Sequence, residues 1–216
     1  PYTILVIIIS GILGLLLAAL VAAIRIKRTK ILYPLTTVYN SFFRSTPNLI
    51  HIFVIYYGLP VLLAPLGIDI NWWSKTVFAV LALVLYNGSF VSEILRPAYL
   101  SVDKGQHDAA DSIAFTGFQK FFRVILPQAL PVALPSLGNA LIDLIKDTSL
   151  LFTIGLIDLM GRARLIIASE YGMGNLEVYI AVALIYWTLT IISERIIKTA
   201  EKRYDKFKLS TGVKLK

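Results

Sequence analysis

The sequence lacks cysteine entirely and holds only two histidines, His51 and His107. Disulfide bonds and thiolate chemistry are therefore excluded, and the histidines form no metal-ligand motif. Charged residues are also scarce, at 16% of the chain, against about a quarter in ordinary soluble domains. Because 57% of the residues are hydrophobic, the chain is predicted to be an all-α, multi-pass integral membrane protein.

Five apolar segments are long enough to cross a bilayer. They are residues 3–24, 48–64, 76–95, 135–155 and 178–197. The first is too long for a cleavable signal peptide and is predicted to be a span. The fourth is expected to begin near Pro135, because Pro127, Pro131 and Pro135 recur every four residues and proline removes hydrogen bonds that a continuous helix needs.

The connections between the spans also predict helices. Residues 31–43 mix aromatic and polar side chains, which favours a helix at the membrane interface. Thr46 is the expected cap of the second span, with Pro47 in its first turn. Residues 157–177 contain an amphipathic stretch, expected to form a short helix that covers a pocket.

Basic residues are distributed unevenly among the connections. Of the 21 lysines and arginines, 17 lie in the first and third connections or from Arg195 onward. Because Lys and Arg are enriched in cytoplasmic loops, the N terminus is predicted to be outside, and the third connection and the tail from Lys198 to Lys216 cytoplasmic. The net charge of +8 therefore needs no nucleic acid to explain it.

The third connection, residues 101–127, carries a spaced motif. Asp108 precedes two alanines, Ala114 stands four residues after the second alanine, and the connection ends in Leu126-Pro127. Alanine is small and a strong helix former, so the motif suits a short helix that docks in a partner's groove, with Asp108 near its start. The alternative is an ordinary surface helix.

This motif resembles the cytoplasmic "EAA" loop of permease subunits in ATP-binding-cassette (ABC) importers. In that family glutamate is usual at the position of Asp108 and glycine at that of Ala114. The resemblance implies an ATPase-docking helix from about Asp108 to Phe115. The residues it assigns to coupling are Gly105, Asp108, Ala109, Ala110, Ala114, Phe115, Leu126 and Pro127.

The fourth span is unusually polar. Asn139, Asp143, Lys146 and Asp147 recur at offsets that place them on one helical face. Intramembrane charges are costly, and they usually face a bundle interior or a water-filled path. The alternative is a structural cluster in which Lys146 pairs with Asp143, Asp147 or Glu93; Glu93 itself has Arg96 three residues on.

Two further stretches resemble polar amino acid permeases of the histidine, glutamine and arginine type. One is Asn139 followed by Lys-Asp-Thr-Ser-Leu from Lys146; the other runs from Tyr39 to Pro47. Relatives often carry an acidic residue at the position of Ala140, and here the carboxylate is Asp143, one helical turn along. The predicted substrate-binding residues are Asn139, Asp143, Lys146, Asp147, Thr148 and Glu93.

The resemblance implies the permease subunit of a type I ABC importer in a prokaryotic cytoplasmic membrane. Its partners would be two ATPase subunits, a second permease subunit, identical or homologous, an extracytoplasmic binding protein, membrane lipid and a polar amino acid. Arginine, lysine, histidine and glutamine are the leading candidates. The chain has no Gly-x-x-x-x-Gly-Lys-Ser/Thr loop, so it is predicted not to hydrolyse ATP by itself. The resemblance implies a non-catalytic subunit with no metal or cofactor of its own, whose partners bind ATP and Mg.

Two other function classes remain open from the residues. An ion-coupled secondary transporter would relay protons through Glu93, Asp143 and Asp147, but five spans without a visible inverted repeat disfavour it. A membrane-embedded enzyme would use the same carboxylates, and the lack of a His or Cys cluster disfavours it. Copurification with an ATPase separates these alternatives, because only the permease predicts a stable complex.

Overall fold

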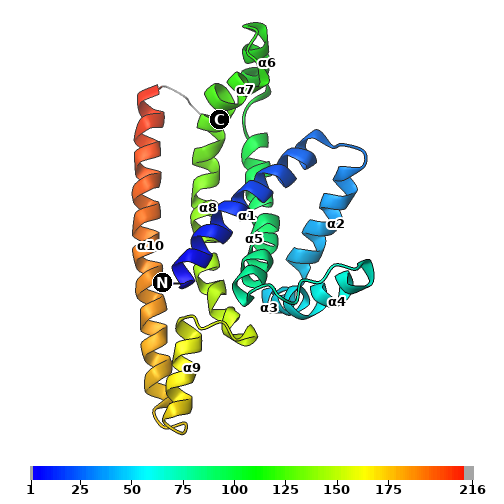
Figure 1. Ribbon diagram of the computed structural model, residues 1–216. Helices are drawn as coiled ribbons and strands as arrows, with labels where there is room; N and C mark the ends of the chain where they lie inside the picture. Colours follow the sequence, from blue (N-terminus) through cyan, green and yellow to red (C-terminus); the bar gives the residue numbers. More distant parts are fainter. Residues whose placement is uncertain (1, 212–216) are drawn as a thin grey trace.

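The structure, a computed structural model, describes residues 2–211 and the side chains of residues 3–202. Every regular element in that range is a helix, which confirms the all-α prediction (Figure 1). Five helical stretches are long and apolar enough to cross a membrane. They are Thr3–Lys27, Asn48–Leu66, Lys75–Leu100, Gly117–Ile154 and Asn175–Lys202.

The contact between α1 (Tyr2–Lys27) and α5 (Lys75–Leu100) is the centre of the bundle. Small side chains at four-residue spacing let two helices approach closely inside a membrane. On α1 the buried stripe of this kind is Val6, Ser10, Gly14, Ala18 and Ala22. The hydrophobic core continues from this contact through Ile52 and Leu83 to Leu144 and Leu151.

Helix α2 (Leu32–Ser45) folds back from the end of α1 and packs on α5 and α1. Its Tyr39 hydroxyl donates a hydrogen bond to the carbonyl of Leu85. The next helix, α3 (Asn48–Phe53), starts two residues after the cap expected from the sequence. The Thr46 prediction was wrong, because Pro47 takes the flanking position in extended conformation, and no side chain caps this helix.

In the second and fourth spans, a π-helical turn precedes a proline. Turn η1 (Val54–Gly58) leads into α4 (Leu59–Leu63), and η3 (Phe121–Ile125) leads into α8 (Leu126–Asp147). In both, the leucine before a proline donates its amide to the carbonyl five residues back. The extra residue per turn moves the backbone away from the following proline ring, which would otherwise clash with the carbonyl four residues before it.

The helix of the fourth span does not begin near Pro135, although the proline spacing predicted that it would. Pro127 falls in the first turn of α8, where its missing amide costs little. Pro131 and Pro135 lie inside the helix, which continues through them. Helix α8 packs against α5 and α10 (Asn175–Thr211), and these contacts stabilise it. Ile197 of α10 occupies the space beside Gly138 that a side chain at that position would fill.

The third connection folds into two short helices at one end of the molecule, α6 (Lys104–Ser112) and α7 (Gly117–Lys120) (Figure 1). Asp108 is the fifth residue of α6, so the expectation that it lies near the helix start was wrong. Asp103 caps the helix instead, accepting a hydrogen bond from the Gly105 amide at 2.7 Å. Ala114 follows α6 with a φ of 55°, in the left-handed region.

At the opposite end, 3₁₀ helix η4 (Thr148–Ile154) leads to α9 (Leu159–Ser169), which pairs with the start of α10 (Figure 1). This is the short helix expected within residues 157–177. Its cap, Asp158, is buried and accepts a hydrogen bond from the Gly161 amide at 2.8 Å; burial raises the pKa of this carboxyl. The predicted basic tail continues α10 to Thr211 and ends outside the described residues.

The left-handed backbone at Ala114 predicts a stabilising substitution. A side chain in this conformation costs about 1 to 2 kcal/mol, and glycine avoids that cost. Replacing Ala114 with glycine should stabilise the α6–α7 connection by about 1 kcal/mol, which corresponds to roughly fivefold slower amide hydrogen exchange in both helices.

The matched control is Ala109→Gly, an exposed position inside α6. Glycine there should accelerate exchange, because it weakens a helix interior by about 1 kcal/mol relative to alanine. Faster exchange in Ala114→Gly as well would contradict the left-handed assignment.

Candidate functional site

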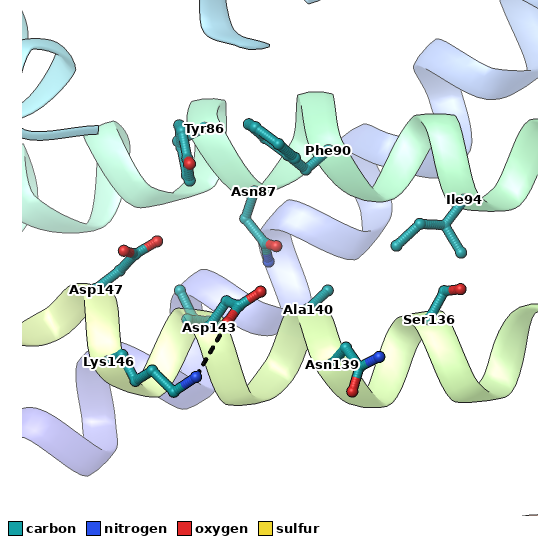
Figure 2. A pocket seen from close by; sticks show the side chains of 11 residues that line it. Tyr86, Asn87, Phe90, Ile94, Ser136, Asn139, Ala140, Asp143, Lys146 and Asp147 are labelled. Carbon is teal, nitrogen blue, oxygen red and sulfur yellow. Dashed lines mark hydrogen bonds and ion pairs between the residues drawn. The ribbon is translucent and has the colours of Figure 1, made fainter. Parts of the chain in front are cut away.

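A cavity of about 430 Å³, lined by both apolar and polar side chains, lies between α5 and α8 (Figure 2). Its volume falls in the range of small-molecule sites, about 300 to 1,000 Å³. The residues that line it come from facing sides of the two helices. They are Tyr86, Asn87, Phe90 and Ile94 of α5, and Ser136, Asn139, Ala140, Asp143, Leu144, Lys146 and Asp147 of α8.

Four of the six predicted binding residues meet in this cavity: Asn139, Asp143, Lys146 and Asp147. Their spacing along α8 puts them on one face, as the sequence predicted. The Lys146 ammonium lies 3.4 Å from a carboxylate oxygen of Asp143. Both side chains are exposed, Lys146 by 53% and Asp143 by 69%, so a ligand can reach either charge.

The wall formed by α5 was missed by sequence reasoning. Tyr86, Phe90 and Ile94 recur every four residues, a spacing that also describes any helix packed in a core. The Tyr86 and Phe90 rings lie 4.7 Å apart. Asn87 points between the helices (Figure 2), and its amide lies 3.1 Å from the position that a Gly14 side chain would take. The feature of the sequence that could have indicated this wall is Asn87, a polar residue in the middle of a predicted span.

Thr148 and Glu93 do not line the cavity. Thr148 is fully buried, and its hydroxyl donates to the Ile145 carbonyl at 2.7 Å. Glu93 forms an ion pair with Arg25 at the end of α1 and accepts a hydrogen bond from Asn40 of α2 at 2.9 Å. The pairing with Arg96 considered from the sequence is therefore replaced by a contact that joins three helices.

The residues assigned to ATPase coupling divide between exposed and buried positions. Those at the surface are Gly105, Asp108, Ala109, Ala114 and Pro127. Ala110 lies on the buried face of α6, and Phe115 and Leu126 are half-buried. Lys120 of α7 binds Asp111 of α6 at 2.7 Å, so the two short helices are braced as one unit.

The cavity combines two carboxylates, an ammonium, two amides and aromatic rings. These groups suit a zwitterion: Lys146 and Asn139 can donate to a carboxylate, while Asp143 and Asp147 can accept from an ammonium or guanidinium. Within residues 3–202, no three His, Cys, Asp or Glu side chains converge as metal ligands. The side chains that line the cavity can form ion pairs and hydrogen bonds with a small polar molecule.

Comparison with known proteins gives consistent matches. The family profile described as "Binding-protein-dependent transport system inner membrane component" matches residues 10–206. The chain is 40% identical over 206 residues to the L-cystine transport system permease protein TcyL of Bacillus subtilis, covering 95% of this chain and 85% of the relative. It is 40% identical over 193 residues to the probable amino-acid ABC transporter permease protein PatM of Vibrio harveyi, covering 89% and 84%.

A solved structure shares the fold along most of its length. It is described as "Crystal structure of an amino acid ABC transporter with histidines". The TM-score is 0.78 at 29% sequence identity, with 93% of this chain and 90% of the other covered.

The position of Glu93 outside the cavity predicts a stability effect. Replacing Glu93 with alanine leaves the charge of Arg25, whose side chain is only 14% exposed, without its carboxylate partner. The free energy of unfolding should therefore fall by about 3 kcal/mol. The measurement is a lower Tm of the purified protein in detergent.

Two further variants serve as controls. The double substitution Arg25→Met with Glu93→Gln should recover most of the loss, because no buried charge is left unpaired. Arg96→Ala should leave Tm unchanged. A loss in Arg96→Ala as large as that in Glu93→Ala would mean that Glu93 relies on Arg96.

Proposed function

The chain belongs to the family of inner membrane components of binding-protein-dependent transport systems, and we propose that it forms the translocation pathway of an ATP-driven importer of polar, chiefly basic, amino acids. It is an amino acid ABC transporter permease, a multi-pass protein of the prokaryotic inner membrane. The observation that supports a basic substrate is the cavity, where Asp143 and Asp147 face the aromatic wall of α5.

The roles of the cavity residues follow from the two charges that every amino acid carries. Lys146 and Asn139 donate hydrogen bonds to the α-carboxylate, and one of the two carboxylates accepts the α-ammonium. The second carboxylate is then free for a cationic side chain, which the faces of Tyr86 and Phe90 also attract. Arginine, lysine and histidine carry a cationic side chain that can pair with the second carboxylate. The side-chain amide of glutamine would instead form hydrogen bonds with the amides of Asn87 and Asn139.

Cystine is a second candidate substrate. The 40% identical TcyL is named an L-cystine permease, and cystine carries two ammonium groups that could occupy Asp143 and Asp147 together. A direct comparison of arginine with cystine on the same preparation decides between them.

In this proposal, the α6–α7 unit is the part of the chain through which ATP binding and hydrolysis by the partner subunits are coupled to transport. Two ATPase subunits bind ATP and Mg. One binds the exposed face of α6 that carries Asp108 and Ala109, and the other binds the same face of a second permease subunit, identical or homologous. Their closure on ATP shifts the equilibrium between inward-open and outward-open arrangements of the spans. An extracytoplasmic binding protein delivers the amino acid on the side where the N terminus lies.

The exposed carboxylate of Asp143 provides the test of this function. In the complex with its ATPase and binding-protein partners in liposomes, a basic amino acid should stimulate ATP hydrolysis. Asp143→Ala should reduce the arginine-stimulated rate at least tenfold, because the loss of one charge-assisted hydrogen bond is worth about 1.5 to 3 kcal/mol. ATP turnover is measured with arginine, lysine, histidine, glutamine and cystine in turn.

Asp69→Ala is the matched control, since Asp69 lies in the exposed turn before α5, where Asn71 hydrogen-bonds to it at 2.8 Å. This variant should keep the full response. An unchanged response in Asp143→Ala removes Asp143 from the binding site. Uptake driven by a proton gradient without any copurifying ATPase would replace the permease by the secondary-transporter alternative.

A further inference from the structure

The Asn87 side chain lies between the cavity and the neighbouring helix α1. It lines the cavity between α5 and α8, and it also lines an apolar groove of about 360 Å³ between α1, α5 and α8. Among the described residues that line this groove, Asn87 is the only one with a polar side chain. An amide turned toward hydrocarbon loses hydrogen bonds, whereas an amide turned toward the cavity can meet a polar ligand. The conformation of Asn87 therefore determines whether the cavity wall offers a further hydrogen-bonding group.

Gly14 of α1 makes room for this side chain. A Cβ atom at position 14 would lie 3.1 Å from the amide nitrogen of Asn87, 3.4 Å from its Cβ and 3.6 Å from its Cγ. The first of these distances is tighter than ordinary van der Waals contact, so a side chain at position 14 would push the amide away from α1 by a few tenths of an ångström. Gly14 does not itself line the cavity. An effect of this residue on the cavity has to pass through Asn87.

Close packing of α1 on α5 does not by itself require an asparagine at this contact. An apolar side chain of the same shape would fill the same space without the cost of burying an amide. Gly11, one turn earlier on α1, faces a methyl group of Leu144, which would lie 3.6 Å from an added Cβ. Of the two glycines of α1, only Gly14 is set against a polar group of the cavity wall.

We propose that Gly14 is a positioning residue for the substrate site, and that it lets the Asn87 amide lie against α1 where it can bind an uncharged polar side chain. This inference rests on the proposed function, in which α8 binds the α-carboxylate and the α-ammonium. An amide both donates and accepts, so Asn87 pairs with the side-chain amide of glutamine. A basic side chain is bound by a carboxylate of α8 instead. The Gly14–Asn87 contact therefore sets how well the site accepts glutamine relative to lysine.

The test compares Gly14→Ala with the wild type in the intact complex with its ATPase. The affinities for L-glutamine and L-lysine are measured from the dependence of Tm on ligand concentration. Gly14→Ala should weaken glutamine binding about threefold, because the displaced amide weakens one neutral hydrogen bond, whose complete loss is worth about fivefold. The affinity for lysine should stay at the wild-type value.

A double-mutant cycle separates positioning from packing. Asn87→Ala removes the amide and keeps a Cβ at 3.4 Å, which leaves room for a methyl group at position 14. The double variant Gly14→Ala with Asn87→Ala should therefore bind glutamine as weakly as Asn87→Ala alone, about fivefold below the wild type. Its Tm without ligand should be at least that of Asn87→Ala, because the added methyl group fills vacated space. If Gly14→Ala alone lowers the yield of complex, this pair of variants carries the test.

Gly11→Ala is the matched control, because its methyl group would make only an ordinary contact with Leu144. It should leave both affinities unchanged. The same loss of glutamine affinity in Gly11→Ala as in Gly14→Ala would mean that any methyl group on this face of α1 has the effect, and it would contradict the role of Asn87.

Three further results would overturn the inference. They are a wild type that binds lysine but not glutamine, a Gly14→Ala variant with the wild-type ratio of the two affinities, and a loss from Gly14→Ala that persists in full when Asn87 is already alanine. In each of these the wild type still binds an amino acid, so the proposed function stands. A wild-type complex that binds neither amino acid would overturn the proposed function together with this inference.

Discussion

The close contact of α1 with α5 is the constraint on which the rest of the structure depends. Inside a membrane there is no hydrophobic driving force between helices, so close packing of small side chains has to hold them together. The stripe around Ser10 and Gly14 brings α1 near enough to limit where Asn87 can lie, and the Arg25–Glu93 pair fixes the other end of the same contact. The face of α5 that looks at α8 is thereby fixed, and the cavity wall with it.

The way the chain accommodates its prolines determines how the cavity is connected to the α6–α7 unit. A helix broken at Pro127 or Pro135 would have separated α8 from the α6–α7 unit. The widened turn η3 instead absorbs the steric conflict and leaves one helical path from Gly117 to Ile154. The same local solution precedes Pro60 in the second span. The short helix α7 and the polar face of α8 therefore belong to one continuous helical path.

The sequence predicted the features that depend on composition and helical period, and it missed those that depend on contacts between distant segments. Hydropathy located five spans, and the spacing of Asn139, Asp143, Lys146 and Asp147 put them on one face, as observed. Glu93 was predicted to bind substrate, with Arg96 or Lys146 as its alternative partner. Its ion pair with Arg25 was missed, because Arg25 is 68 positions away and only the α1–α5 packing brings it near. Tyr86 and Phe90 were missed because an aromatic wall and a packed core share the same period. The start of the fourth helix was predicted wrongly, because the cost of a proline in a helix can be relieved locally.

The bracing of α6 against α7 has a consequence for how force would pass through the protein. The Lys120–Asp111 ion pair joins the two sides of the Ala114 turn. After the turn, the Arg123 guanidinium lies 5.8 Å from the centre of the Phe115 ring. This ion pair restrains the turn, so α6 and α7 are expected to move together. A displacement of α6 would then be passed to α7 and to the long helix that follows it, which carries Asp143 and Asp147 near its other end.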